Sequence, residues 1–91
     1  MTTQEQIALV FLREVAGISN ATEHDPKLRQ LLNNEGKCAD VLTTRGMTYE
    51  VSGKTAVVTK GSVSVTKIAA AGDRHTSAIM AAAIEVYRET K

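Results

Sequence analysis

Residues 47–68 read MTYEVSGKTAVVTKGSVSVTKI, and this stretch decides the fold because its apolar residues alternate with polar ones. Alternation with a period of two is typical of strands that bury one face. Two pairs, Ser52-Gly53 and Gly61-Ser62, interrupt the alternation, and pairs of this composition favour two-residue hairpin turns. The stretch therefore predicts a three-stranded antiparallel meander over about 47–68.

Placing both turns at these pairs predicts the register of the meander. Tyr49 then lies opposite Ala56. Val58 in the middle strand has Met47 on one side and Val65 on the other. One face becomes almost wholly apolar and the other mostly polar, which supports both turns at once. We expect the apolar face to be buried, and it comprises Met47, Tyr49, Val51, Ala56, Val58, Val63 and Val65.

The segment before the sheet predicts three helices, because its apolar residues recur three and four positions apart. Asp25 followed by Pro26 is a strong signal for a helix start. The stretch Asn33-Asn34-Glu35-Gly36 separates the second helix from the third. One continuous helix through Gly36 is the alternative, at a cost of roughly 1 kcal/mol. The predicted spans are about 4–17, 26–34 and 37–45.

A fourth helix is predicted after the sheet, over about 74–90, with Asp73 as its N-cap. It is rich in alanine, so it can lie close to a sheet or to another helix. The sequence therefore predicts a single α+β domain of residues 1–91, in which helices from both ends of the chain pack on the apolar face of the sheet.

The triplet Gly53-Lys54-Thr55 spells the end of a phosphate-binding loop. A working loop needs a glycine four residues upstream, a strand before it and a helix after it. The nearest upstream glycine is Gly46, and the residues that follow alternate like a strand. We therefore interpret the triplet as a hairpin turn and not as a nucleotide site.

Few residues could carry catalysis or hold a metal. His24 and His75 each lie near an acid in the sequence, but two histidines without a ligand spacing define no site. Cys38 is the only cysteine and lies on the apolar face of its predicted helix, where a buried thiol is unreactive. We expect no enzymatic activity, no catalytic residues, no metal and no cofactor.

Residues 26–45 also permit a DNA-binding interpretation. Two short helices joined by a turn follow the plan of a helix-turn-helix, and the 47–68 sheet could serve as a wing. A second route is the polar sheet face, although it lacks the aromatic residues that stack on bases. Asp40 would oppose phosphate on the exposed side of the second helix. The candidate nucleic-acid contacts are Lys37, Thr44, Arg45, Lys54, Lys60 and Lys67.

Composition favours no particular class of partner. The net charge is +1, and the core must be mainly aliphatic because the chain has only one Phe, two Tyr and no Trp. A single cysteine permits no internal disulfide. The apolar run Ile7 to Leu12 is too short for a signal sequence or a membrane span. These features predict a cytoplasmic protein that does not enter a membrane.

The helices carry more apolar surface than one small sheet covers. The first is apolar over a broad stripe, and the last is thin and rich in alanine. We therefore expect a homodimer, with Leu9, Leu12, Ala78 and Ala82 as candidate interface residues. The predicted function is a small non-catalytic protein-binding module, such as an adaptor, an assembly factor or an inhibitor. A nucleic-acid-binding regulator is the alternative.

Overall fold

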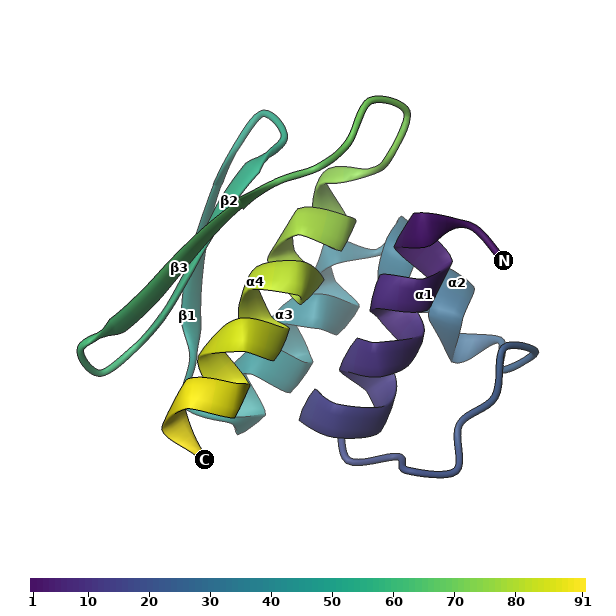
Figure 1. Ribbon diagram of the computed structural model, residues 1–91, viewed down its shortest axis with the longest axis horizontal. Helices are drawn as coiled ribbons and strands as arrows, with labels where there is room; N and C mark the ends of the chain where they lie inside the picture. Colours follow the sequence, from purple (N-terminus) through teal and green to yellow (C-terminus); the bar gives the residue numbers. More distant parts are fainter.

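The computed structural model describes residues 1–91 as an α+β fold, with four α-helices and one three-stranded antiparallel sheet around a common core (Figure 1). Helices precede and follow the sheet and pack against it, as the sequence predicts. A short π-helix, η1, continues α1. The elements are α1 Thr3–Val10, η1 Phe11–Val15, α2 Lys27–Asn33, α3 Glu35–Thr44, β1 Thr48–Ser52, β2 Thr55–Lys60, β3 Val63–Ile68 and α4 His75–Thr90.

The sheet has the strand order β1-β2-β3, and both hairpins are antiparallel. The register of the second hairpin is confirmed, because Val58 lies opposite Val65 and the loop is Gly61-Ser62. The middle strand therefore contributes its apolar residues to the same face as β3.

The first hairpin corrects the prediction. Val51 lies opposite Ala56, so the loop begins at Gly53 and not at Ser52. Gly53 and Gly61 both have φ of 60° and both take the first loop position. A glycine with positive φ at that position, followed by a residue with negative φ, is what a type II′ turn requires. Strand β2 follows this loop, so the segment is a hairpin turn and lacks the helix of a phosphate-binding loop.

The apolar face of the sheet is covered as predicted, although two predicted pairings are wrong. Tyr49, and not Met47, lies opposite Val58, so Tyr49 does not face Ala56. The pairing moves by two residues, which leaves every side chain on its predicted face. Ala56 and Val58 are wholly buried, and Met47 is buried just before β1. Ile68 lies on the opposite face and is exposed.

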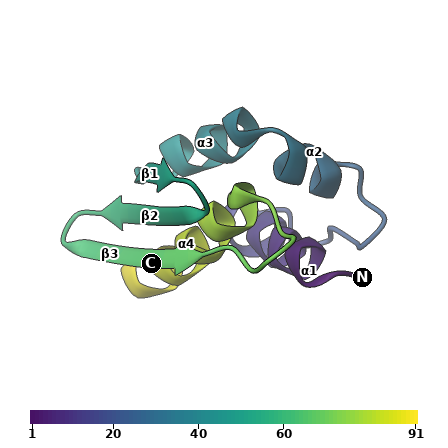
Figure 2. The same ribbon diagram turned by 90° about the horizontal axis from the view of Figure 1, so that it is seen from above.

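Helix α4 lies at the centre of the molecule, between the sheet on one side and the N-terminal helices on the other (Figures 1 and 2). Nine of its 16 residues are buried. A helix covered on several sides must be apolar around most of its surface. This position explains the run of small residues, because alanine lets the sheet and η1 approach the α4 backbone closely.

The break between α2 and α3 is confirmed and falls at Asn34, although α3 begins at Glu35 and not at Lys37. Asn34 has an extended backbone (φ −137°, ψ 102°), and its Oδ1 accepts a hydrogen bond from the Gly36 N–H at 2.9 Å. Asparagine is among the best N-cap residues. Asp25 caps the start of α2 in the same way, accepting from the Lys27 N–H at 2.9 Å.

The predicted cap of α4 is wrong. The Asp73 side chain makes no capping hydrogen bond. The backbone N–H of Asp73 donates to the Ala70 carbonyl within the preceding turn. The Arg74 N–H instead donates to Gln4 Oε1 of α1 at 3.1 Å. A residue from a distant helix thus satisfies this helix end, which local sequence does not reveal. None of the helices has the length and hydropathy needed to cross a membrane.

Candidate peptide-binding groove

A groove of about 260 Å³ lies between η1 on one side and the helices α2 and α3 on the other. Its floor is apolar and consists of buried or half-buried side chains, whereas its rim is polar and exposed. The floor residues are Leu12, Ala16, Ile18, Leu31 and Val41, and the rim residues are Lys27, Gln30, Lys37 and Asp40.

The helices α2 and α3 present the same pattern to the groove. Each contributes a lysine, then a polar residue three positions later and an apolar residue four positions later. Residues at this spacing share one face of a helix. Since Asn34 alone separates the two helices, both faces contribute to one groove. The two sets are Lys27, Gln30 and Leu31 on α2, and Lys37, Asp40 and Val41 on α3.

The opposite wall of the groove is the π-helix η1. The Ala16 N–H donates to the Phe11 carbonyl at 3.0 Å, which is the five-residue spacing of a π turn. Leu12 and Ala16, from this turn and its end, lie at the groove. Single π turns inside helices occur frequently at functional sites. Apolar periodicity predicts a helix here but does not distinguish a π turn from an α turn.

Two arginines fix the end of this wall. Arg45 Nε donates to the Val15 carbonyl at 2.6 Å, and its guanidinium lies 5.6 Å from the centre of the Tyr87 ring. Arg13 Nε donates to the Ala21 carbonyl at 2.8 Å in the connection that follows. Side-chain donors thus satisfy carbonyls that η1 and its connection leave free. The groove wall is therefore supported from outside the groove.

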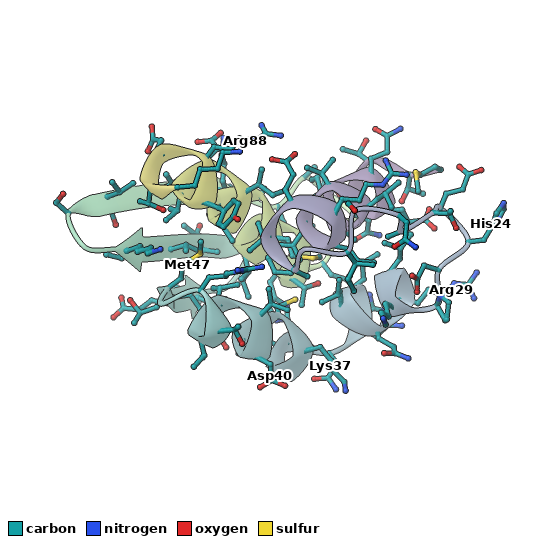
Figure 3. All side chains as sticks on the ribbon, turned by 90° about the horizontal axis from the view of Figure 1, so that it is seen from below. His24, Arg29, Lys37, Asp40, Met47 and Arg88 are labelled. Atoms are coloured by element: carbon teal, nitrogen blue, oxygen red, sulfur yellow. The ribbon has the colours of Figure 1, made fainter.

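The charges at the rim are unpaired. Lys37 and Asp40 project outward from α3 (Figure 3), and neither they nor Lys27 take part in any of the four ion pairs of the structure. With two lysines and one aspartate, the rim carries a formal charge of +1. These side chains are free to meet charges on a binding partner.

A second polar cluster joins three elements, and sequence reasoning missed it. The Tyr49 hydroxyl of β1 donates to Glu35 Oε2 at 2.6 Å, and His75 Nε2 of α4 lies 2.8 Å from Glu35 Oε1. The sequence placed His75 beside Asp73, but its partner is 40 residues away. Glu35 begins α3 and His75 begins α4, so only the packing of these helices brings them together.

Hydrogen bonds in this cluster shift two pKa values. The bonds from Tyr49 and His75 to the ionised carboxylate hold the pKa of Glu35 below its ordinary value. The same carboxylate raises the pKa of Tyr49 to about 12, because a hydroxyl that donates to a negative charge loses its proton reluctantly. No pocket of the structure includes Glu35, Tyr49 or His75. The cluster therefore ties α3, β1 and α4 together without facing a substrate-sized space.

The remaining residues that could carry chemistry, Cys38 and His24, line neither the groove nor the cluster around Glu35. Cys38 is wholly buried and its thiol donates to the Leu31 carbonyl at 3.2 Å. Burial raises the pKa of Cys38 to about 12, which leaves no reactive thiolate at neutral pH. His24 is exposed and lies 3.6 Å from Glu23. No group of three or more His, Cys, Asp or Glu side chains could hold a metal ion.

The six candidate nucleic-acid contacts come from several elements, and two of them are engaged within the chain. Arg45 is engaged with η1 and Tyr87, as described above, and Lys67 forms an ion pair with Glu85 at 2.6 Å. Lys54 and Lys60 flank opposite ends of β2. The other two, Lys37 and Thr44, lie on the exposed side of α3.

The helix pair also differs from a helix-turn-helix in its connection. Such motifs join their helices by a turn of about three to four residues, whereas Asn34 alone separates α2 from α3. On the exposed side of α3, Lys37 is offset by Asp40, whose carbonyl accepts from the Thr44 hydroxyl at 2.9 Å. That side therefore offers no net positive charge to phosphates.

The candidate dimer residues lie mostly inside the single chain. Leu12, Ala78 and Ala82 are buried by neighbouring elements of the same chain, and only Leu9 is partly exposed. The apolar surface that suggested a dimer is covered by the central position of α4 and by the packing of α1 and η1 against it. Ala78 and Ala82 offer no free surface to a second subunit, and Leu12 is accessible only at the floor of the groove.

Comparison of the chain with known protein families, with curated proteins and with solved structures found no match.

Proposed function

We propose that the chain is a small non-catalytic protein-binding module whose groove receives a segment of a partner protein. The observation that carries this proposal is the groove itself, with an apolar floor from three helices and the connection after η1, and an exposed polar rim. An apolar centre inside a polar rim is the usual anatomy of a protein interface. Grooves between helices commonly receive the apolar face of a partner segment.

The size of the groove favours a peptide over a small molecule. Its volume of about 260 Å³ is below the roughly 300–1,000 Å³ of typical ligand pockets. A space of this size suits one or two apolar side chains, while the rest of the partner segment lies across the rim. A cofactor would need a larger and more enclosed cavity.

The chemistry of the lining supports a binding role as well. The groove has no histidine, cysteine, serine or threonine among its lining residues, so it lacks a hydroxyl or thiol nucleophile and the usual general base. Its only carboxylate is the exposed Asp40. A cytoplasmic location, predicted from the sequence, agrees with a free and buried Cys38.

Nucleic-acid binding has less support, because its candidate residues are dispersed or already engaged. Its test is a gel-shift titration with random duplex DNA and RNA at about 50 and 200 mM salt, the range over which phosphate contacts lose affinity. Lys60→Glu is the informative variant. Arg45→Glu would mainly disturb the fold, because Arg45 supports η1.

The protein-binding proposal is tested by comparing the proteins retained on the immobilised chain with those retained on variants. Gln30→Trp places a large ring over the groove from an exposed rim position, and Val41→Asp puts a charge on its floor. We expect both to lose the same retained protein. Thr66→Asp, on the exposed face of the sheet, is the matched control and should retain it.

Thermal unfolding separates loss of binding from loss of folding. Gln30→Trp changes only an exposed side chain, so its unfolding temperature should match that of the parent chain within a few degrees. Sedimentation velocity on the same samples measures self-association. Equal retention by the parent chain and by both groove variants would contradict the proposal.

A further inference from the structure

The charged rim of the groove indicates which kind of partner the groove prefers, whereas the apolar floor does not. An apolar floor accepts any apolar side chain of suitable size, so it sets affinity and not identity. Charged groups around a contact set orientation and exclude wrong partners. At this groove the charged groups are Lys27, Lys37 and Asp40.

The two lysines belong to different helices on the same side of the groove. Lys27 is the first residue of α2, and Lys37 is in the first turn of α3. Both are exposed and neither forms an ion pair. The seven residues of α2 include Arg29 as a further cation and no acid. Asp40, on α3, is the one negative charge at the groove.

Each of these two helices thus places an unpaired cation beside the apolar contact, where it favours a carboxylate of the partner. Asp40 disfavours a carboxylate at its own position, which makes the pattern asymmetric and able to fix one orientation of the partner.

The walls determine the backbone form of the partner. The groove is lined by η1, the connection that follows it, α2 and α3, and none of these is a strand whose edge a partner could extend. Binding must rely on side chains, and a helix presents apolar and charged side chains on adjoining stripes.

We infer that the groove recognises an amphipathic helix of another protein, with one or two apolar anchors on the floor and Asp or Glu beside them against Lys27 and Lys37. This inference rests on the proposed function and adds the chemistry of the partner. The charge at the rim selects acidic helices over basic helices of equal apolar content.

The test uses a displayed library of amphipathic helices with leucine at the anchor positions and Glu, Gln or Lys at the flanking positions. Selection on the folded chain should enrich Glu over Lys. Fluorescence polarisation should then give the Glu form an affinity about tenfold above that of the Lys form at low salt, as expected for two exposed ion pairs. Raising the salt to physiological strength should reduce this ratio.

The double variant Lys27→Glu/Lys37→Glu should reverse the preference toward Lys helices. Both substitutions place a carboxylate in the first turn of a helix, where the dipole favours it, so the variant should fold. Lys54→Glu/Lys60→Glu makes the same change in net charge at the ends of β2 and should leave the preference unchanged.

The outcomes separate the inference from the function on which it rests. Helices that bind, that lose binding in Gln30→Trp and that show no preference between Glu and Lys would overturn the inference and leave the protein-binding function standing. A preference that Lys54→Glu/Lys60→Glu alters equally would also overturn it, because the selection would then reflect net charge. Failure of every helix to bind would contradict both.

Discussion

Arg45 supports the wall of the groove although its own side chain does not line the groove. It follows α3 directly, yet its guanidinium reaches the carbonyl of Val15 at the end of η1 and lies over the Tyr87 ring of α4. A cation near a helix C-terminus satisfies carbonyls that the helix leaves free. The contact therefore joins three helices at the point where the groove wall ends.

Replacing Arg45 should destabilise the fold. Arg45→Ala removes a hydrogen bond from a charged donor and a cation–π contact, and we expect a loss of about 2 kcal/mol in the free energy of unfolding. Arg45→Lys should recover less than half of this, because lysine lacks the planar fork. Urea unfolding measures the change. Lys54→Ala, in an exposed turn, is the control, and an Arg45→Ala effect as small as that of the control would refute this role.

Glu35 also stabilises the fold as a single residue, through side-chain hydrogen bonds whose contribution depends on pH. Its folded pKa is lowered from 4.5, so its contribution to stability is complete above that value and is lost as the pH falls through the folded pKa. Tyr49 has its pKa raised from 10.0 to about 12, so its contribution is complete below 10 and is lost as the pH rises through about 12.

Alkaline titration of tyrosine absorbance tests this pair. In a Tyr87→Phe background Tyr49 is the only tyrosine, and it should titrate near 12. Adding Glu35→Gln removes the carboxylate and should bring the Tyr49 pKa back toward 10.0. A Tyr49 pKa that Glu35→Gln leaves unchanged would show that the carboxylate does not set it.

At the scale of elements, the two hairpins show what local sequence determines. The alternation of residues 47–68 predicted three strands and their buried face, because the side-chain period of a strand is two. It did not determine the first register, since a shift of two residues in pairing preserves the same faces. The rule that settles it is the position of the glycine within the loop. Gly53 and Gly61 obey that rule equally.

Alanine at these two glycines should therefore cost similar amounts. Both have φ of 60° and no atom near a new Cβ, so strain of the backbone is the only penalty. We expect Gly53→Ala and Gly61→Ala each to lower the free energy of unfolding by about 1–2 kcal/mol. Denaturant unfolding of the two variants gives the comparison. An unaffected Gly53→Ala would contradict the loop position reported for the first hairpin.

The helices likewise have some features that local sequence predicts and others that it does not. Their number and order could be predicted, because apolar spacing and caps such as Asp25 are local signals. The π turn of η1 and the Gln4 cap of α4 could not, because both arise where α1 and η1 meet α4. The groove depends on that meeting too. Its lysines were visible in the sequence, but nothing local places residues 12–18 opposite α2 and α3.

At the scale of the whole molecule, the central position of α4 explains how a chain with so few aromatic residues forms a core. A chain of 91 residues with a single Phe and no Trp builds its core by covering an alanine-rich helix on two sides. That arrangement accounts for the apolar surface that suggested a dimer. It leaves the groove beside η1 as an apolar floor ringed by exposed polar side chains.

The most direct test of the account is site-specific photocrosslinking in cells that express the chain. A photoreactive side chain replaces Gln30 at the groove rim in one variant and Thr66 on the exposed sheet face in another. The account predicts a discrete crosslinked protein from position 30, none from position 66, and loss of the crosslink when Val41→Asp is added. A discrete crosslink from position 66 alone, or equal yields from both positions, would contradict the groove as the binding surface.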